Sequence, residues 1–502
     1  MSFSSQTIPP PSDERAGHRQ LKRGAIGVVG ILFFVLSAQA PLTGIGGALP
    51  LAVALGNGAG APAAYLVVGL VIALFAVGFI AMSRHITAEG AFYAYIGRGL
   101  GRRLGTGSAL LALWAYNTVQ ACMYGLYGVI VSFLADTYLG VAPPWWACAL
   151  VTMVLIQVLG SLNIELGARF LGVLVAAEMA ILLAFALVTL VTGGGPEGLN
   201  PGASFSPSAL LAGAPGIALT FGIASMFGFE STAIYSAEAK DPARTVPRAT
   251  YLAVGTIALF FAFVSWMVVS SYGADQVVAA AGSALESGDG TVLLFAAISD
   301  ALGPWAAEVG GVLLATSLLA GILAFHNASN RYVHSLGESG ALPAVVSRTT
   351  RQGAPFVASG LQTVLALVLV MPFAVLGLDP VLTLFAWFSG VAVLGLVVLY
   401  FLTSISVVVF FRRTRLDTRP WHTLVAPVLA AVLIAALAAL VLTNFTLLIG
   451  GSVGTAVPLV LSVPLVLLIG MALESLRRHP ADDEPPSAST DTPGLTTADS
   501  TA

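Results

Sequence analysis

Charged side chains are scarce in this sequence. Asp, Glu, Lys and Arg together make up only 9% of its 502 residues, whereas about a quarter of the residues in soluble domains are charged. A water-soluble enzyme is therefore not expected. The net charge of −3 provides no basic surface, which argues against a nucleic-acid partner.

Cysteine is nearly absent as well. Cys122 and Cys148 both lie in apolar stretches and form no C-x-x-C pattern, so neither a disulfide framework nor a zinc site is expected. The six histidines make no H-E-x-x-H motif, which is the spacing that places two ligands on one face of a helix. We expect no metal and no cofactor.

Long apolar segments dominate what is present. Hydrophobic residues account for 57% of the chain, and a membrane-spanning helix needs about 20 consecutive apolar residues. The sequence therefore predicts an all-α polytopic membrane protein with twelve transmembrane helices. These lie at about 26–55, 62–83, 107–138, 143–162, 170–192, 214–236, 249–271, 304–326, 355–377, 380–411, 423–448 and 453–475.

The distribution of basic residues supports this count, because cytoplasmic loops of membrane proteins are enriched in Lys and Arg. With the N-terminus inside and the sides alternating, all 21 Lys and Arg residues fall in inner segments, and the outer loops carry only acidic charges. This partition favours a multi-pass protein of the cytoplasmic membrane with both termini in the cytoplasm. Residues 1–20 and 480–502 are rich in Pro, Ser, Thr and acids and are expected to be disordered tails.

The first span imitates a signal peptide, because Ala38-Gln39-Ala40 after an apolar run matches the pattern of a cleavage site. Pro41 would follow the cut, where a residue without an N–H fits a protease poorly. We therefore expect this span to be retained.

Two spans contain residues that interrupt a helix. The first includes Pro41 followed by Gly44, Gly46 and Gly47, and the sixth carries Gly222 and Gly228 around an apolar core. Proline removes a helical hydrogen bond, and each glycine costs about 1 kcal/mol relative to alanine. Such residues also permit close packing of membrane helices, so one interrupted span alone would be weak evidence for a binding site.

The position of the two interrupted spans gives them meaning. Spans one and six are corresponding members of two five-span halves, at about 26–192 and 214–411, and an odd number of spans inverts the second half. Paired interruptions in an inverted repeat indicate a transporter's binding site near the middle of the membrane. Half-helix ends present N–H groups to an anion and carbonyl groups to an ammonium. An amino acid, which carries both charges, fits such a site better than a sugar.

Four segments carry a resemblance to a known family. They are Ala40–Gly46 in the first span, Glu89–Tyr95 (EGAFYAY), the sixth-span sequence Phe227–Glu230 with its exit Ala237–Ala249 (AEAKDPARTVPRA), and Arg331–Pro343 (RYVHSLGESGALP). In order and spacing they resemble the amino acid–polyamine–organocation (APC) superfamily of amino acid permeases, over about residues 22–478. The resemblance implies a LeuT-like 5+5 inverted repeat with two further C-terminal helices at about 423–475. It also implies secondary active transport by alternating access.

The resemblance also implies where the substrate binds. The carboxylate of a small-molecule substrate would meet Ala40, Thr43 and Gly44 of the first span. Its amino group would meet the sixth span. The residues implied there are Ile223, Ala224 and Ser225, with Phe227 near the gate. Residues of the third and tenth spans would form the side-chain pocket, although these match no sharp motif and are equally suited to packing or to hydrogen bonds between helices. The candidates are Asn117, Gln120, Tyr124, Trp387 and Ser389.

Glu178 and Glu230 are the only acids well inside apolar spans. A charged residue there costs at least about 2.5 kcal/mol and marks a functional candidate. Glu230 corresponds to the family's glutamate after the sixth-span break and is the first choice for proton coupling, although it would also suit a role in bridging helices. Glu178 departs from the lysine that many proton-coupled relatives carry near this point. Glu178 suits either a titratable carboxyl group or a cation ligand beside Thr316 and Ser317. The coupling ion is therefore open at this position, with protons favoured over sodium.

The favoured function is a proton-coupled amino acid transporter. The alternatives are an amine or polyamine carrier and a substrate exchanger. An intramembrane enzyme would need clustered catalytic groups, and no lysine or aspartate lies well inside any span, so an enzyme is not expected. The partners implied are an amino acid or related amine, protons or sodium, and the lipid bilayer.

Overall fold

The computed structural model describes residues 27–86, 91–161, 168–230, 232, 240–338, 340, 342–350 and 355–476. Within these ranges the regular secondary structure is entirely helical and contains no strand, which confirms the all-α prediction for this part of the chain. The tails expected at 1–20 and 480–502 lie outside the described residues.

The long helices follow the apolar stretches of the sequence. They are α1 (Val28–Gln39), α3 (Ala61–Ser83), α5 (Arg102–Leu139), α6 (Trp145–Ser161), α7 (Ala168–Thr192), α12 (Pro242–Tyr272), α15 (Pro304–Glu338), α16 (Phe356–Val375), α17 (Ala386–Thr414), α18 (Ala426–Leu448) and α19 (Val453–Leu476). Shorter helices are α2 (Leu49–Leu51), α4 (Ala91–Leu100), α8 (Pro201–Phe205), α9 (Pro207–Leu210), α10 (Pro215–Ala224), α13 (Val277–Glu286) and α14 (Val292–Leu302). Tighter or wider turns form η1 (Thr43–Ala48), η2 (Ala52–Asn57), η3 (Gly58–Gly60), η5 (Ala344–Ser347), η6 (Pro380–Phe385) and η7 (Trp421–Val425).

Among the described residues, nine helical segments are long and apolar enough to cross a membrane. The other expected spans fall short for identifiable reasons. The sixth contributes only α10 before it is interrupted, and the fourth, α6, has 17 residues. The second half of the first span runs on into α3 as a single segment, Thr43–Ser83, despite non-helical backbone at Gly56.

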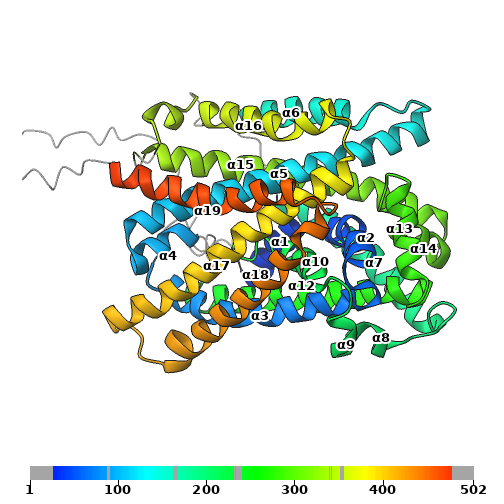
Figure 1. The fold of residues 1–502 in the computed structure, drawn as a ribbon, viewed down its shortest axis with the longest axis horizontal. Helices are drawn as coiled ribbons and strands as arrows, with labels where there is room; N and C mark the ends of the chain where they lie inside the picture. Colours follow the sequence, from blue (N-terminus) through cyan, green and yellow to red (C-terminus); the bar gives the residue numbers. More distant parts are fainter. Residues whose placement is uncertain are drawn as a thin grey trace, which may run out of the picture.

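The helices run broadly along one direction and leave their connections at two opposite ends (Figure 1). Helices α8, α9, α13 and α14 gather at one end, whereas α4 and the connection between α17 and α18 lie at the other. Helices α5, α6, α15 and α16 pack together along one side, and α1, α3, α10, α12, α17 and α18 occupy the rest of the bundle.

Close helix packing fixes α19 against α5. A Cβ on Gly470 of α19 would lie 2.7 Å from the Cα of Gly107 in α5, so the two backbones touch where both residues lack a side chain. Near the ends of the same helices, Glu474 is buried, forms an ion pair of 3.3 Å with Arg102 and accepts a hydrogen bond of 3.0 Å from Thr106. The C-terminal helix is therefore attached to the long third span at two levels.

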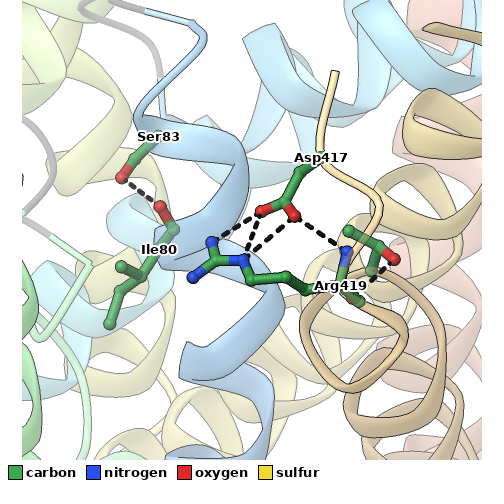
Figure 2. Close-up of polar contacts among 5 residues, drawn as sticks. Ile80, Ser83, Asp417 and Arg419 are labelled. Carbon is green, nitrogen blue, oxygen red and sulfur yellow. Dashed lines mark hydrogen bonds and ion pairs between the residues drawn. The ribbon is translucent and has the colours of Figure 1, made fainter. Parts of the chain in front are cut away.

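The connection from α17 to η7 is held by a local ion pair. The Arg419 guanidinium donates to the Asp417 carboxylate at 2.6 Å, and the Arg419 backbone N–H donates to the same group at 3.0 Å. Figure 2 shows this pair beside the last turn of α3, where Ser83 donates to the carbonyl of Ile80. The ion pair thus closes the connection between α17 and η7 next to the end of the second span.

Candidate functional site

The first span is interrupted at Ala40. Helix α1 ends at Gln39, and Ala40 adopts a φ of 44°, a left-handed conformation that costs an L-residue roughly 1–2 kcal/mol. The residue before a proline is also disfavoured in the right-handed helical region, so Pro41 accounts for the break at this position. Helical turns resume beyond it and widen into η1.

The sixth span is interrupted just after Ala224. Helix α10 ends there, and residues 225–230 form a series of turns. Gly228 has a φ of 93°, which only glycine adopts without strain. The backbone N–H of Gly228 donates to Glu230 at 3.0 Å, so the carboxylate stabilises the turn that replaces the helix.

The two interruptions are in direct contact. The side-chain amide of Gln39, at the end of α1, donates a short hydrogen bond to the carbonyl of Phe227 in the sixth-span turns. Gln39 and Phe227 are both buried. One amide group therefore links the break in the first span to the break in the sixth.

A cavity of about 80 Å³ lies between these interruptions. One water molecule needs about 10–15 Å³ by the same kind of measure, so the space suits several waters or a small solute. Both broken spans and parts of α5, α15 and α17 contribute its walls. The lining residues are Gln39, Ala40, Thr43, Gly44, Ala48, Val119, Cys122, Met123, Phe221, Ala224, Ser225, Phe227, Phe325, Phe385 and Ser389.

Most of the residues predicted for the two breaks line this cavity. They are Ala40, Thr43, Gly44, Ala224, Ser225 and Phe227, and the tenth-span candidate Ser389 joins them. Ile223 is buried outside the lining, and its carbonyl accepts a hydrogen bond from Met226. The Thr43 hydroxyl has no hydrogen-bond partner among the described residues, which leaves it available to a ligand.

The remaining pocket candidates lie elsewhere. Asn117 donates to the carbonyl of Leu113 in its own helix at 2.8 Å, and Tyr124 is buried outside the lining. Trp387 packs its ring against Phe373. Gln120 donates to the carbonyl of Ile322 and accepts from Gln362 at 2.5 Å, so it connects three helices rather than facing the cavity.

The two buried acids occupy different environments. Glu230 accepts from the Tyr116 hydroxyl at 3.4 Å as well as from Gly228, which ties the sixth-span turns to α5. Glu178 accepts at 3.2 Å from the backbone N–H of Leu42, just after the first break. Each carboxyl group therefore contacts one interrupted span.

The candidate cation ligands are only partly arranged around Glu178. The hydroxyl of Ser317 lies beside the Glu178 carboxyl group, but the hydroxyl of Thr316 donates to the carbonyl of Leu313 in its own helix. Within the described ranges, no group of three His, Cys, Asp or Glu residues is placed to hold a metal ion.

Several lining residues were not predicted from the sequence. Gln39 is the polar one, and its place directly before Ala40-Pro41 in an apolar span was a usable signal. The apolar lining residues, such as Met123 and Phe325, carry no such signal because they resemble any other residue of a membrane helix.

Two other features lie outside this cavity. A groove of about 450 Å³ between α17 and α18, which opens to the surface at the exposed Val428 and Val432, has almost entirely apolar walls, with Ser404 as the one polar lining residue. His326 is buried and lies 2.9 Å from Ser359, which in turn donates to Gln157 at 3.3 Å. Neither feature brings charged or free backbone groups to a solute, so the cavity between the broken spans is the candidate site.

Comparison with known proteins agrees with this geometry. The profile of the family described as "Amino acid permease" matches residues 33–485. Uncharacterized transporters of Mycobacterium tuberculosis and Mycobacterium bovis are 27% identical to the chain over 341 residues, a match that covers 61% of this chain and 66% of each relative. The chain thus spans just under two thirds of the length of these relatives.

The fold is similar to that in the crystal structure of MhsT in complex with L-phenylalanine. The TM-score is 0.61, and the match covers 84% of this chain and 100% of the other. The two sequences are 18% identical, so the likeness concerns the fold.

Proposed function

The chain belongs to the amino acid permease family, and from this premise we propose that it is a secondary active transporter that moves amino acids across the cytoplasmic membrane by alternating access. The transported solute is a small molecule that carries an amino group and a carboxylate. Both termini lie in the cytoplasm in this proposal, as the distribution of basic residues indicates.

One observation carries the proposal. Two interrupted helices meet at a single cavity, which is lined by Ala40, Thr43 and Gly44 from one break and by Ala224, Ser225 and Phe227 from the other. Irregular backbone at membrane depth is tolerated where it is buried in protein or lines a cavity, and interrupted helices are how many transporters expose backbone groups to substrates. The phenylalanine complex of MhsT, which shares the fold, supports an amino acid as the solute.

The architecture that we propose has twelve crossings. Repeats at about 26–192 and 214–411 are related by inversion, and helices at about 423–475 complete a permease domain over 22–478. The interruptions at Ala40 and after Ala224 support this arrangement, because they occur in the first member of each repeat. Tails at 1–20 and 480–502 are proposed to lie on the cytoplasmic side.

Protons are the proposed coupling ion, with Glu230 as the carboxyl group that carries them. Its contacts with Gly228 and Tyr116 support this role, because a change in its charge would act on the sixth-span turns and on α5 together. Sodium bound near Glu178, Thr316 and Ser317 is the alternative. The orientation of the Thr316 hydroxyl toward its own helix weakens that alternative.

Uptake into proteoliposomes tests the proposal. A labelled amino-acid mixture is offered to the purified chain with an inward proton gradient, with an inward sodium gradient and with neither. We expect accumulation only with the proton gradient. Accumulation driven by the sodium gradient alone would reject proton coupling. Uptake that depends on unlabelled amino acid inside the proteoliposomes and on neither ion gradient would indicate an exchanger. No uptake of any amino acid under all three conditions would reject the proposed function.

A further inference from the structure

One polar atom of the Gln39 amide group forms a hydrogen bond, and the other forms none within the described part of the chain. Its Nε2 donates to the carbonyl of Phe227. Because a carbonyl oxygen only accepts hydrogen bonds, the atom that faces it must be the nitrogen, which fixes the orientation of the amide. The Oε1 atom then remains, and it accepts no hydrogen bond within the described part of the chain. The Gln39 side chain lines the cavity and is only 6% exposed.

Two of the three residues implied for binding the ammonium group, Ile223 and Ala224, have backbone carbonyls that already accept hydrogen bonds. The carbonyl of Ile223 accepts from Met226, and that of Ala224 accepts from Phe227. The carbonyl of Phe221 accepts from both the N–H and the hydroxyl of Ser225. Buried polar atoms are costly to leave unpaired, so the free Gln39 Oε1 is the acceptor in this cavity that most needs a partner.

The walls contributed by α5, α15, η6 and α17 are mostly apolar. They are Val119, Cys122 and Met123 of α5, the rings of Phe325 and Phe385, and Ser389, whose hydroxyl donates to the Cys122 sulfur at 3.5 Å. No Asp, Glu, Lys or Arg belongs to the lining. A charged substrate side chain would be desolvated there without a partner of opposite charge, which is strongly unfavourable.

We propose, on the premise of the transport function above, that Gln39 is a substrate-binding residue and that the cavity selects neutral amino acids with compact apolar side chains. The Gln39 Oε1 accepts a hydrogen bond from the substrate ammonium, while its Nε2 holds the sixth-span turns in place. The Thr43 hydroxyl, also without a partner in the described ranges, donates to the substrate carboxylate. The substrate side chain points toward Val119, Cys122 and Met123.

Protection of Cys122 from a small neutral maleimide measures binding without transport. The chain has two cysteines, so a Cys148→Ala variant leaves Cys122, which lines the cavity, as the single thiol. We expect L-alanine, L-valine and L-leucine to slow its labelling, by about tenfold at roughly ten times the Kd. L-lysine, L-glutamate and putrescine at the same concentrations should not. Equal protection by lysine or putrescine would overturn the selectivity.

The role of Gln39 is tested by comparing L-leucine with 4-methylpentanoate, which has the same side chain and carboxylate but no amino group. We expect the unmodified site to prefer leucine strongly. Gln39→Met, which keeps the volume of the side chain, should reduce this preference at least about tenfold, because the hydrogen bond to the charged group is lost. Gln39→Glu retains an acceptor and adds negative charge, so putrescine should gain protection in that variant.

Gln157→Met is the matched control. Gln157 is a partly buried amide on α6 that bonds Ser161 and accepts from Ser359, away from the cavity. Its loss disturbs helix packing but should leave the preference for leucine over 4-methylpentanoate unchanged. A Gln39→Met variant that folds, transports and keeps the full preference would overturn the role of Gln39.

If both Gln39 variants fail to fold, the protection of Cys122 by neutral but not by charged compounds, measured with Gln39 unchanged, still tests the selectivity. Failure of the transport function has a different outcome, in which no amino acid protects Cys122 and none is taken up by proteoliposomes.

Discussion

At the scale of single residues, one buried carboxyl group links each interrupted helix to a neighbouring helix. Glu230 joins the sixth-span turns to α5 through Tyr116, and Glu178 joins the restart of the first span to α7 through the N–H of Leu42. Both carboxyl groups are almost fully buried, with 3% of Glu230 and none of Glu178 exposed. A buried charge next to a helix break acts on that break, so a change in protonation at either position would alter the local backbone.

Glu230→Gln should separate substrate movement from proton coupling. The amide keeps the shape of the side chain. Its oxygen can still accept from the N–H of Gly228 and its NH2 group can donate to the Tyr116 hydroxyl, but it does not release a proton. We expect accumulation driven by a proton gradient to be abolished, while counterflow of labelled against unlabelled amino acid is retained. Both are measured in the same proteoliposomes.

Glu178→Gln is the companion variant for this experiment. Under the proposal it lowers the stability of the first-span break but leaves some gradient-driven accumulation. Undiminished accumulation by Glu230→Gln would remove Glu230 from the coupling role, and loss of accumulation only in Glu178→Gln would transfer that role to Glu178.

At the scale of helices, small residues decide which elements approach closely. The contact of α19 with α5 depends on Gly470 and Gly107, since a Cβ on Gly470 would meet the Gly107 Cα at 2.7 Å and the Thr106 carbonyl at 2.9 Å. Backbone atoms cannot rotate away as a flexible side chain can. The attachment of the C-terminal helix is therefore sensitive to a single methyl group.

Gly470→Ala should destabilise the protein by about 1–3 kcal/mol, the usual cost of overpacking a tight contact. Thermal unfolding followed by the loss of monodisperse protein on size-exclusion chromatography measures this effect. Gly454→Ala is the matched control on the same helix, because its Cβ would meet only the Ser452 hydroxyl at 3.8 Å. A Gly470→Ala variant as stable as Gly454→Ala would show that the two helices are not in backbone contact.

The connection between α17 and η7 gives a pH-dependent contribution to stability. Hydrogen bonds from Arg419 lower the pKa of Asp417 from 3.8 to about 2. A carboxylate with a lowered pKa in the folded state stabilises the protein above the unfolded pKa, and this contribution is lost as the pH falls through the folded value. The stabilisation is thus complete at neutral pH and disappears between pH 3.8 and about 2.

Asp417→Asn should lower the stability by up to about 1 kcal/mol at pH 7, the usual range for an ion pair at the protein surface. Thermal unfolding of the variant and the parent, measured from pH 7 downward, should give a constant difference until roughly pH 5, which then narrows below about pH 4. Thr418→Ala, a neighbouring exposed position, controls for changes in the loop. A difference that widens as the pH falls would contradict the assigned ion pair.

The helix breaks could be predicted from the sequence, whereas the cavity walls contributed by α5 could not. Pro41 and the glycines are local signals, and they marked the first break within a residue of Ala40. On α5, the cavity is lined by Val119, Cys122 and Met123. The predicted Asn117, Gln120 and Tyr124 lie on other faces of the same helix. A uniformly apolar helix gives no information on its rotation. Choosing its polar residues therefore selected Gln120, which bonds to neighbouring helices, and Asn117, which bonds within its own helix.

At the scale of the whole molecule, the two ends of the bundle differ in charge. Helices α13 and α14 lie at one end, and the connection after α17 lies at the opposite end (Figure 1). The α17 end carries Arg412, Arg413, Arg415 and Arg419, whereas the segment from 273 to 303 has acidic residues and no Lys or Arg. Since cytoplasmic loops retain the positive charges, the end with the arginines should face the cytoplasm.

Cysteine labelling tests this orientation. Ser283 on α13 and Thr418 after α17 are both exposed, and the parent chain for this test has both Cys122 and Cys148 replaced by alanine. With a membrane-impermeant maleimide, Ser283→Cys should be labelled in intact cells well above the parent chain. Thr418→Cys should be labelled only after the membrane is permeabilised, because its end of the bundle is on the inner side. Permeabilised cells serve as the control for the reactivity of both thiols. Labelling of Thr418→Cys but not Ser283→Cys in intact cells would reverse the orientation, and labelling of both would mean that the two ends of the bundle are not separated by the membrane.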